Sequence, residues 1–269
     1  MVPHAAGKPG VANADAVRRQ GIRGLLLRGL SLLVATIASF AFGLSPLRRH
    51  LPEQSAGTEA IVRSLVSAFD QADIVALGEA HQSEPDSELR IALIRNPQFA
   101  KKVHFIVVEF ASTTEQSILD RFIDGEDVPH AQLEQVWKTT TQAENGTWGS
   151  PVYLAFFQSV RDVNMGLRPD ERIRVLGGDP GPGDHRSREV AAVDVIRDQV
   201  LRRHAKALLI YGAAHFYRAV PKDYLATMGE DGGIVSMLEK DAHARILSVI
   251  SDEAEIISLI SRFVHGLPS

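Results

Sequence analysis

Two glycine turns carry the residues with the clearest capacity for chemistry. The sequence Gly-Glu-Ala-His stands at 78–81 and Gly-Ala-Ala-His at 212–215, each directly after a short, β-branched apolar run. Such runs, when they end in glycine, are typical of buried strands. In open α/β sheets, ligands bind outside the carboxyl ends of the strands. Glu79, His81 and His215 are therefore expected at a functional edge of a sheet.

Two further predicted strands lead to carboxylates. Glu109 directly follows the apolar run at 105–108, and Asp179 follows the run at 173–176 in a loop with four glycines and two prolines. The carboxyl ends of parallel strands lie on one edge, so residues far apart in sequence can converge there. We expect Glu109 and Asp179 near the two glycine turns.

Carboxylates and imidazoles gathered at one edge support two kinds of chemistry. They can bind a divalent metal ion through nitrogen and oxygen atoms. The ligand set would then be Glu79, His81, Glu109 and His215. They can also act without metal. A histidine, His81 or His215, would then take a proton from water. Glu79 and Glu109 would orient that histidine, and Asp179 would assist. A neighbouring carboxylate raises the basicity of an imidazole.

Each of these residues also has a structural interpretation. Glu109 could cap a helix or pair with an arginine, as buried charges do. His81 and His215 could be hydrogen-bonded core residues, and Asp179 could cap its loop. Two neighbours are candidates for contact with a cofactor or ligand: Tyr217, two residues after His215, and His185 in the glycine-rich loop.

Charge is distributed unevenly along the 269 residues. Residues 1–50 carry a net charge of +6, and the remainder carries −10. Such an acidic body argues against a nucleic-acid partner, which requires a basic surface. There is no cysteine, which excludes thiolate metal sites, cysteine nucleophiles and disulfides. A chain of this size can build its core without them.

The N-terminus has the pattern of an export signal. Four arginines precede an uncharged, apolar run of 19 residues at 29–47. This is a positive segment followed by a hydrophobic one, and its length is close to the ~20 residues that span a bilayer. We predict that residues 1–50 are a signal peptide or membrane anchor plus linker that contacts the membrane or export machinery. The location would be extracytoplasmic (periplasmic), secreted or anchored.

Residues 51–269 alternate predicted strands and helices. Strands are expected at 73–77, 105–108, 173–176, 207–211 and 246–250, and helices at 58–69, 113–123, 152–163, 187–204 and after residue 252. This alternation predicts one α/β domain with a mostly parallel central sheet flanked by helices. Residues 125–165 form a helical insertion, which we expect to determine the choice of substrate.

The order of these motifs resembles a known superfamily. It contains the ChaN-like haem-uptake proteins, the Tiki/TraB metalloprotease-like proteins and the erythromycin esterases. The shared pattern is a strand followed by Gly-Glu-x-His, a second strand ending in Glu109, and a late Gly-x-x-His. The segment 115–122, Gly125 and Trp137 are most similar to the ChaN branch. The likeness covers residues about 70–220.

The resemblance implies an α/β fold with a helical insertion and a cleft built from the glutamate–histidine turns. The esterase branch places an extra residue between its glutamate and histidine, so macrolide hydrolysis is not expected. The leading hypothesis is an exported hydrolase for a small-molecule or peptide substrate, with or without a divalent metal. The alternative is a non-catalytic protein that binds haem or another iron-bearing ligand in the same cleft, and a third is a degenerate member with an interaction role.

Overall fold

The structure is a computed structural model that describes residues 56–218 and 232–250. The predicted signal or anchor at 1–50 and the helix predicted after residue 252 lie outside the described residues. Within the two described ranges, no helix combines the length and the apolar character needed to cross a membrane.

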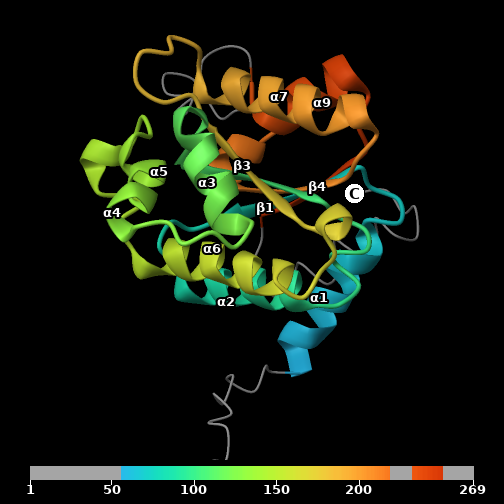
Figure 1. The fold of residues 1–269 in the computed structure, drawn as a ribbon. Helices are drawn as coiled ribbons and strands as arrows, with labels where there is room; N and C mark the ends of the chain where they lie inside the picture. Colours follow the sequence, from blue (N-terminus) through green and yellow to red (C-terminus); the bar gives the residue numbers. More distant parts are fainter. Residues whose placement is uncertain (1–55, 219–231, 251–269) are drawn as a thin grey trace, which may run out of the picture. The chain divides into compact units, whose positions relative to one another are not determined.

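A single parallel sheet forms the centre of the fold (Figure 1). In the part of the chain that the structure describes, it has five strands in the order β3-β2-β4-β1-β5. Their bounds are β1 Ile74–Glu79, β2 Phe105–Ser112, β3 Arg174–Asp179, β4 Ala207–Gly212 and β5 Ile246–Val249. The central strands β2, β4 and β1 deliver their carboxyl ends side by side. The predicted parallel α/β fold is confirmed.

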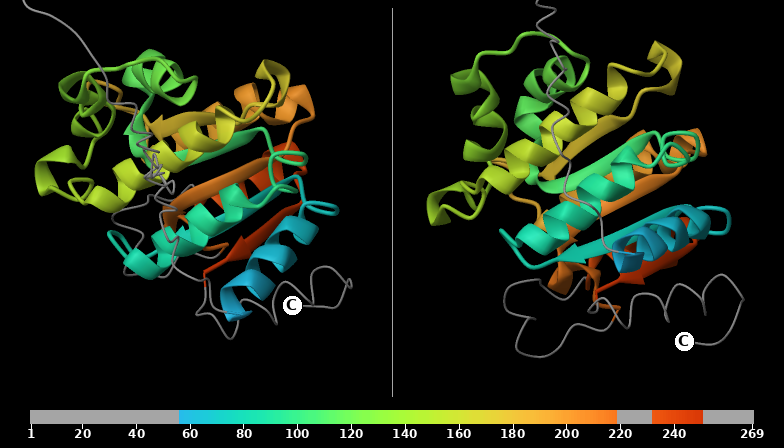
Figure 2. Two further views of the ribbon diagram at one scale, coloured as in Figure 1. Left: turned by 60° about the horizontal axis from the view of Figure 1, so that its bottom comes forward. Right: turned by 90° about the horizontal axis from the view of Figure 1, so that it is seen from below.

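Helices cover the sheet in two layers. One hydrophobic core contains residues from α1 (Ala56–Ala68), α2 (Glu84–Arg95), α3 (Gln116–Ile123) and α6 (Pro151–Asn164). The other contains residues from α7 (Arg188–Gln199) and α9 (Ile234–Ala242). The short helices α4 (His130–Leu133) and α5 (Gln135–Lys138) belong to the predicted helical insertion. Seen from below in Figure 2, the α1, α2 and α6 layer lies in front of the sheet.

Alternating strand residues supply the two cores. In β1, Val75 and Leu77 belong to the first core, whereas Ile74 and Ala76 belong to the second. This is the pleat of a strand, in which successive side chains point to opposite faces. This alternation of side chains determines which helices the polar residues near the end of each strand can contact.

Four strands continue further than the sequence predicts, and for β4 the difference is one residue, to Gly212. β1 ends at Glu79 rather than residue 77, β2 at Ser112 rather than 108, and β3 at Asp179 rather than 176. The prediction stopped each strand at the end of its apolar run. Backbone pairing does not stop there, because Glu79 aligns with Gly212 and Ser112 with Asp179. The helices predicted at 113–123 and 187–204 include short 3₁₀ turns, Thr113–Glu115 before α3 and Leu201–Arg203 after α7.

Gly178 of β3 is required by the side chain of Tyr211, which reaches it from β4 on the other side of β2. The Tyr211 side chain is fully buried, and its hydroxyl occupies the space that a side chain at 178 would take. A Cβ atom at Gly178 would lie 1.6 Å from the Tyr211 hydroxyl oxygen and 3.2 Å from the carbonyl oxygen of Val108. The phenol ring therefore packs against bare backbone.

Replacing Gly178 by alanine is expected to destabilise the protein by about 1–3 kcal/mol, the usual cost of overpacking a core. Urea denaturation measures the change in the free energy of unfolding. The matched control is Gly166→Ala, where the new Cβ would lie 3.5 Å from the Val163 carbonyl oxygen, an ordinary contact. Equal stability of the two variants would contradict the close approach.

Candidate functional site

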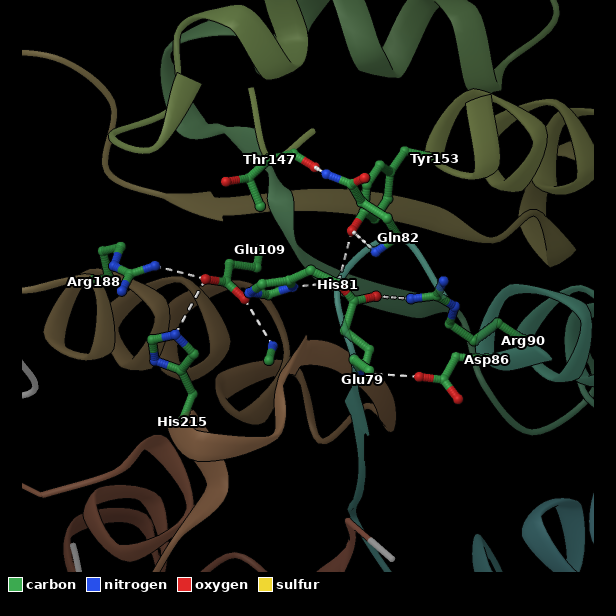
Figure 3. Close-up of polar contacts among 12 residues, drawn as sticks. Glu79, His81, Gln82, Asp86, Arg90, Glu109, Thr147, Tyr153, Arg188 and His215 are labelled. Atoms are coloured by element: carbon green, nitrogen blue, oxygen red, sulfur yellow. Dashed lines mark hydrogen bonds and ion pairs between the residues drawn. The ribbon is translucent and has the colours of Figure 1, made fainter. Parts of the chain in front are cut away.

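The carboxylate of Glu79, at the end of β1, is buried and held by three side chains (Figure 3). Arg90 of α2 donates from Nη1 to Oε2. The Tyr153 hydroxyl of α6 donates to Oε1 at 3.1 Å, and Nδ1 of His81 lies 2.9 Å from the same oxygen. Burial lowers the pKa of Arg90 to about 10, which leaves it charged at neutral pH. Glu79 and Arg90 thus form a buried ion pair without net charge.

The His81 ring is oriented by Glu79 and packs over Gly212. A Cβ at Gly212 would lie only 2.9 Å from Cε1 and 3.1 Å from Nε2 of His81, so a larger residue there would displace the ring. The edge of Trp148 contacts the ring, with 4.8 Å between centroids. Burial lowers the pKa of His81, although Glu109 acts to raise it. A neutral ring that donates from Nδ1 to Glu79 keeps its lone pair on Nε2.

Glu109 of β2 forms a second buried cluster. Its Oε1 accepts from Nη1 of Arg188 at 2.6 Å and lies 3.1 Å from Nε2 of His215. Its Oε2 accepts from the backbone N–H of Gly212 at 2.8 Å. Burial raises the pKa of Glu109, but the hydrogen bonds from His215 and Gly212 and the charges of His215 and Arg188 outweigh it. The pKa is thereby lowered to about 2.

His215 lies between two carboxylates. Nε2 faces Glu109, and Nδ1 lies 2.7 Å from Oε1 of Glu189, a residue of α7. Burial lowers the pKa of His215, but these two carboxylates outweigh burial and raise it to about 9. At neutral pH the ring is therefore an imidazolium that donates from both nitrogens. Of the two histidines predicted as a base, His81 is the one with a free lone pair.

The pleat of the strands places the two carboxylates on opposite faces of the sheet. Glu79 points to the same face of the sheet as Leu77, which belongs to the first core, so Glu79 contacts α2 and α6. Glu109 points to the same face of the sheet as Val107, which belongs to the second core, so Glu109 contacts α7. His81 lies just beyond the end of β1, and Gly212 contacts both clusters.

Asp179 has a different environment from the other predicted residues. Its Oδ1 accepts from the backbone N–H groups of Thr141 at 2.8 Å and Gly181 at 2.9 Å, and Oδ2 accepts from the Thr141 hydroxyl at 2.6 Å. Burial raises the pKa of Asp179. These bonds tie the helical insertion to the end of β3. His185 is exposed and Tyr217 is half-buried, and their contact with a ligand stays a prediction.

The sequence analysis missed four residues that complete the clusters: Arg90, Tyr153, Arg188 and Glu189. Two of them carried a signal. Arg90 lies on the buried side of α2 with Ser87 and Ile94, and an arginine at such a position requires a buried counter-charge. Glu189 begins a buried stripe of α7 that continues at 192, 193 and 196.

The predicted metal ligands are divided between the two clusters. Among residues 56–218 and 232–250, no three histidine, aspartate or glutamate side chains are arranged to hold a metal ion. Both nitrogens of His215 face carboxylates, and both oxygens of Glu79 accept hydrogen bonds.

Two hollows differ sharply in size. The first, beside Glu79 and Arg90, has a volume of about 30 Å³, which suits a water molecule. The second is an apolar groove of about 400 Å³ between α3, α4 and α6, within the range of about 300–1,000 Å³ typical of small-molecule sites. We call it the insertion groove; its lining includes Phe122, Val128, His130, Leu133, Leu154 and Ala155.

Comparison with known proteins supports one family. Residues 65–168 match the family model described as haem-binding uptake, Tiki superfamily, ChaN. The predicted resemblance is confirmed. The match extends from within α1 to just beyond α6 and contains Glu79, His81, Glu109 and the insertion groove, whereas Arg188 and His215 lie beyond it. Neither the curated proteins nor the solved structures give a significant match.

The raised pKa of His215 predicts a stability that depends on pH. The pKa of His215 is about 9 in the folded protein, against an ordinary value of 6.5. The protonated ring therefore stabilises the folded state fully below pH 6.5, and this contribution is lost as the pH rises through 9. In Glu189→Gln, which removes one carboxylate, the loss between pH 6.5 and 9 should be smaller than in the wild type by on the order of 1–2 kcal/mol.

Urea denaturation at both pH values measures this difference. The matched control is Glu144→Gln, at an exposed residue of the helical insertion. It should lose the same stability as the wild type over this range. If Glu189→Gln behaved like the control, His215 would not be stabilised as an imidazolium by Glu189.

Proposed function

We propose that the protein binds haem, as the alternative hypothesis from the sequence states. The observation that carries this proposal is the match of residues 65–168 to a haem-binding uptake family. Haem is a large apolar plane with an iron centre, so it requires an apolar recess and an axial side chain. When bound, it supplies a redox-active iron; the residues of the chain hold it and shield its faces from water.

The size of the two hollows supports one place for a porphyrin over the other. The hollow of about 30 Å³ beside Glu79 is far too small for it. The insertion groove, at about 400 Å³ and with mostly apolar walls, is of the size and character that a porphyrin needs. The residues present therefore fit haem at the groove rather than in the hollow beside Glu79.

Haem binding predicts a saturable change in absorbance. Haemin added to the full-length chain should shift the Soret band and saturate at about one haem per chain, because one groove supplies one apolar site. Absorbance titration measures this directly, with haemin in buffer as the reference. A Soret band that grows without saturation, or does not shift, would contradict the proposal.

A second candidate function is hydrolysis, which the geometry around His81 favours. Glu79 holds Nδ1 at 2.9 Å, and the His81 side chain is 35% exposed. Nε2 would take a proton from a water molecule as the water oxygen attacks an ester or amide carbonyl, and Glu79 would stabilise the imidazolium that forms. The imidazolium would then return the proton to the alcohol or amine as its bond to the carbonyl carbon breaks. The His215 imidazolium and Arg188 would offset the charges of Glu109 and Glu189, so this cluster would carry no net charge near His81.

Hydrolysis predicts that His81 is essential for turnover. His81→Ala should lower kcat/KM toward p-nitrophenyl acetate by on the order of a hundredfold, because the general base is lost. Since the pKa of His81 is lowered, the half-maximum of wild-type activity should lie below pH 6.5, the ordinary pKa of histidine. The matched control is His104→Ala, at an exposed histidine. Equal rates in both variants would rule out His81 as the base.

We also propose that the protein acts outside the cytoplasm. The positive and then apolar pattern of residues 1–50 supports this location, and a role in haem uptake is consistent with it. Residues 1–50 would contact the membrane or the export machinery, and the small-molecule ligand would be met in the periplasm.

A further inference from the structure

We infer that haem would occupy the insertion groove and that Nε2 of His130 would hold its iron. This inference rests on the proposed haem binding and deepens it by naming the place and the ligand. It differs from the expectation that a ligand would occupy the edge of the sheet beside Glu79 and His81.

The walls of the groove suit the porphyrin plane. Phe122 of α3, Leu133 of α4 and Val128 between these helices are buried and form its base, and Leu154 and Ala155 of α6 form a side. Placing an aromatic plane against such side chains removes apolar surface from water on both partners. Ala155 is exposed, so this wall is open to solvent, where the propionate groups of haem can stay hydrated.

His130 supplies the group that iron requires. It lines the groove, and its side chain is 64% exposed. Nδ1 lies 3.8 Å from Oε1 of Glu134, one helical turn further along the chain. Metal-bound histidines commonly direct their second nitrogen toward a carboxylate. Nε2, on the opposite edge of the ring, is then the nitrogen that remains for the iron.

Other histidines of the family-matched segment suit the iron less well. Nε2 of His81 packs closely over Gly212, and His81 lines neither the insertion groove nor the hollow beside Glu79. His104 precedes β2 and does not line the groove. All the residues that line the groove lie within 65–168, the segment that matches the haem-binding family. The groove therefore combines adequate volume, apolar walls and an imidazole in one place.

The test uses haemin and the full-length chain, with two variants of the groove. His130→Ala should weaken haemin binding by at least about tenfold and alter the Soret band, since the iron loses its protein ligand. Added imidazole should restore the band by replacing the missing ring. Ala155→Trp fills the groove from the exposed face of α6 and should also weaken binding by about tenfold, a cost of roughly 1.4 kcal/mol.

Matched controls separate these effects from general damage. His104→Ala and Ala131→Trp change exposed residues outside the groove lining, and both should bind haemin as the wild type does. Circular dichroism confirms that each variant is folded.

Three outcomes would overturn the inference. If the wild type binds haemin but His130→Ala and Ala155→Trp bind it equally well, the haem lies elsewhere and haem binding itself stands. If His81→Ala, rather than His130→Ala, removes the wild-type Soret band, the ligand is at the strand ends. If the wild type shows no saturable binding, the proposed haem binding falls and the groove assignment falls with it.

Discussion

Two buried carboxylates, at the carboxyl ends of β1 and β2 on either side of β4, impose the main constraint on this structure. A charge removed from water is stable only when a partner of opposite charge is held against it. Glu79 has Arg90 on one face of the sheet, and Glu109 has Arg188 and His215 on the other. With Glu189 included, the second cluster has two carboxylates and two cations. Each face is therefore electrically balanced on its own, and helices from both layers must reach the same edge.

The domain offers two places that suit two different kinds of chemistry. At the end of β1, Glu79 lies beside a space for water and holds the ring of His81 in place, an arrangement that suits proton transfer. The insertion groove has apolar walls and a larger volume, which suits a broad organic ligand. The sequence analysis placed both hypotheses in one cleft, whereas the structure offers a different place for each.

The sequence predicted the parallel sheet, the helical insertion and the polar strand ends, because hydrophobic periodicity and glycine turns are local signals. It could not predict that Glu79 and Glu109 face opposite layers, since that depends on strands continuing past their apolar runs. It also missed Arg90 and Arg188, whose roles depend on contacts across 11 and 79 residues of sequence. The hydrogen bonds of Asp179 could likewise not be predicted, because their donor Thr141 is a residue of the insertion without a motif of its own.

The alternation of side chains along β1 and β2 has a consequence for how such a chain can evolve. A one-residue insertion or deletion in either strand would turn every later side chain to the other face. Glu79 would then face away from Arg90, or Glu109 away from Arg188, and a bare charge would be left in the core. In the helical insertion, a change of one residue does not turn side chains from one face of a sheet to the other. The insertion can therefore change in length and sequence, whereas the strands cannot. Diversity in ligand choice is therefore expected to accumulate in the insertion, over an edge whose spacing stays fixed.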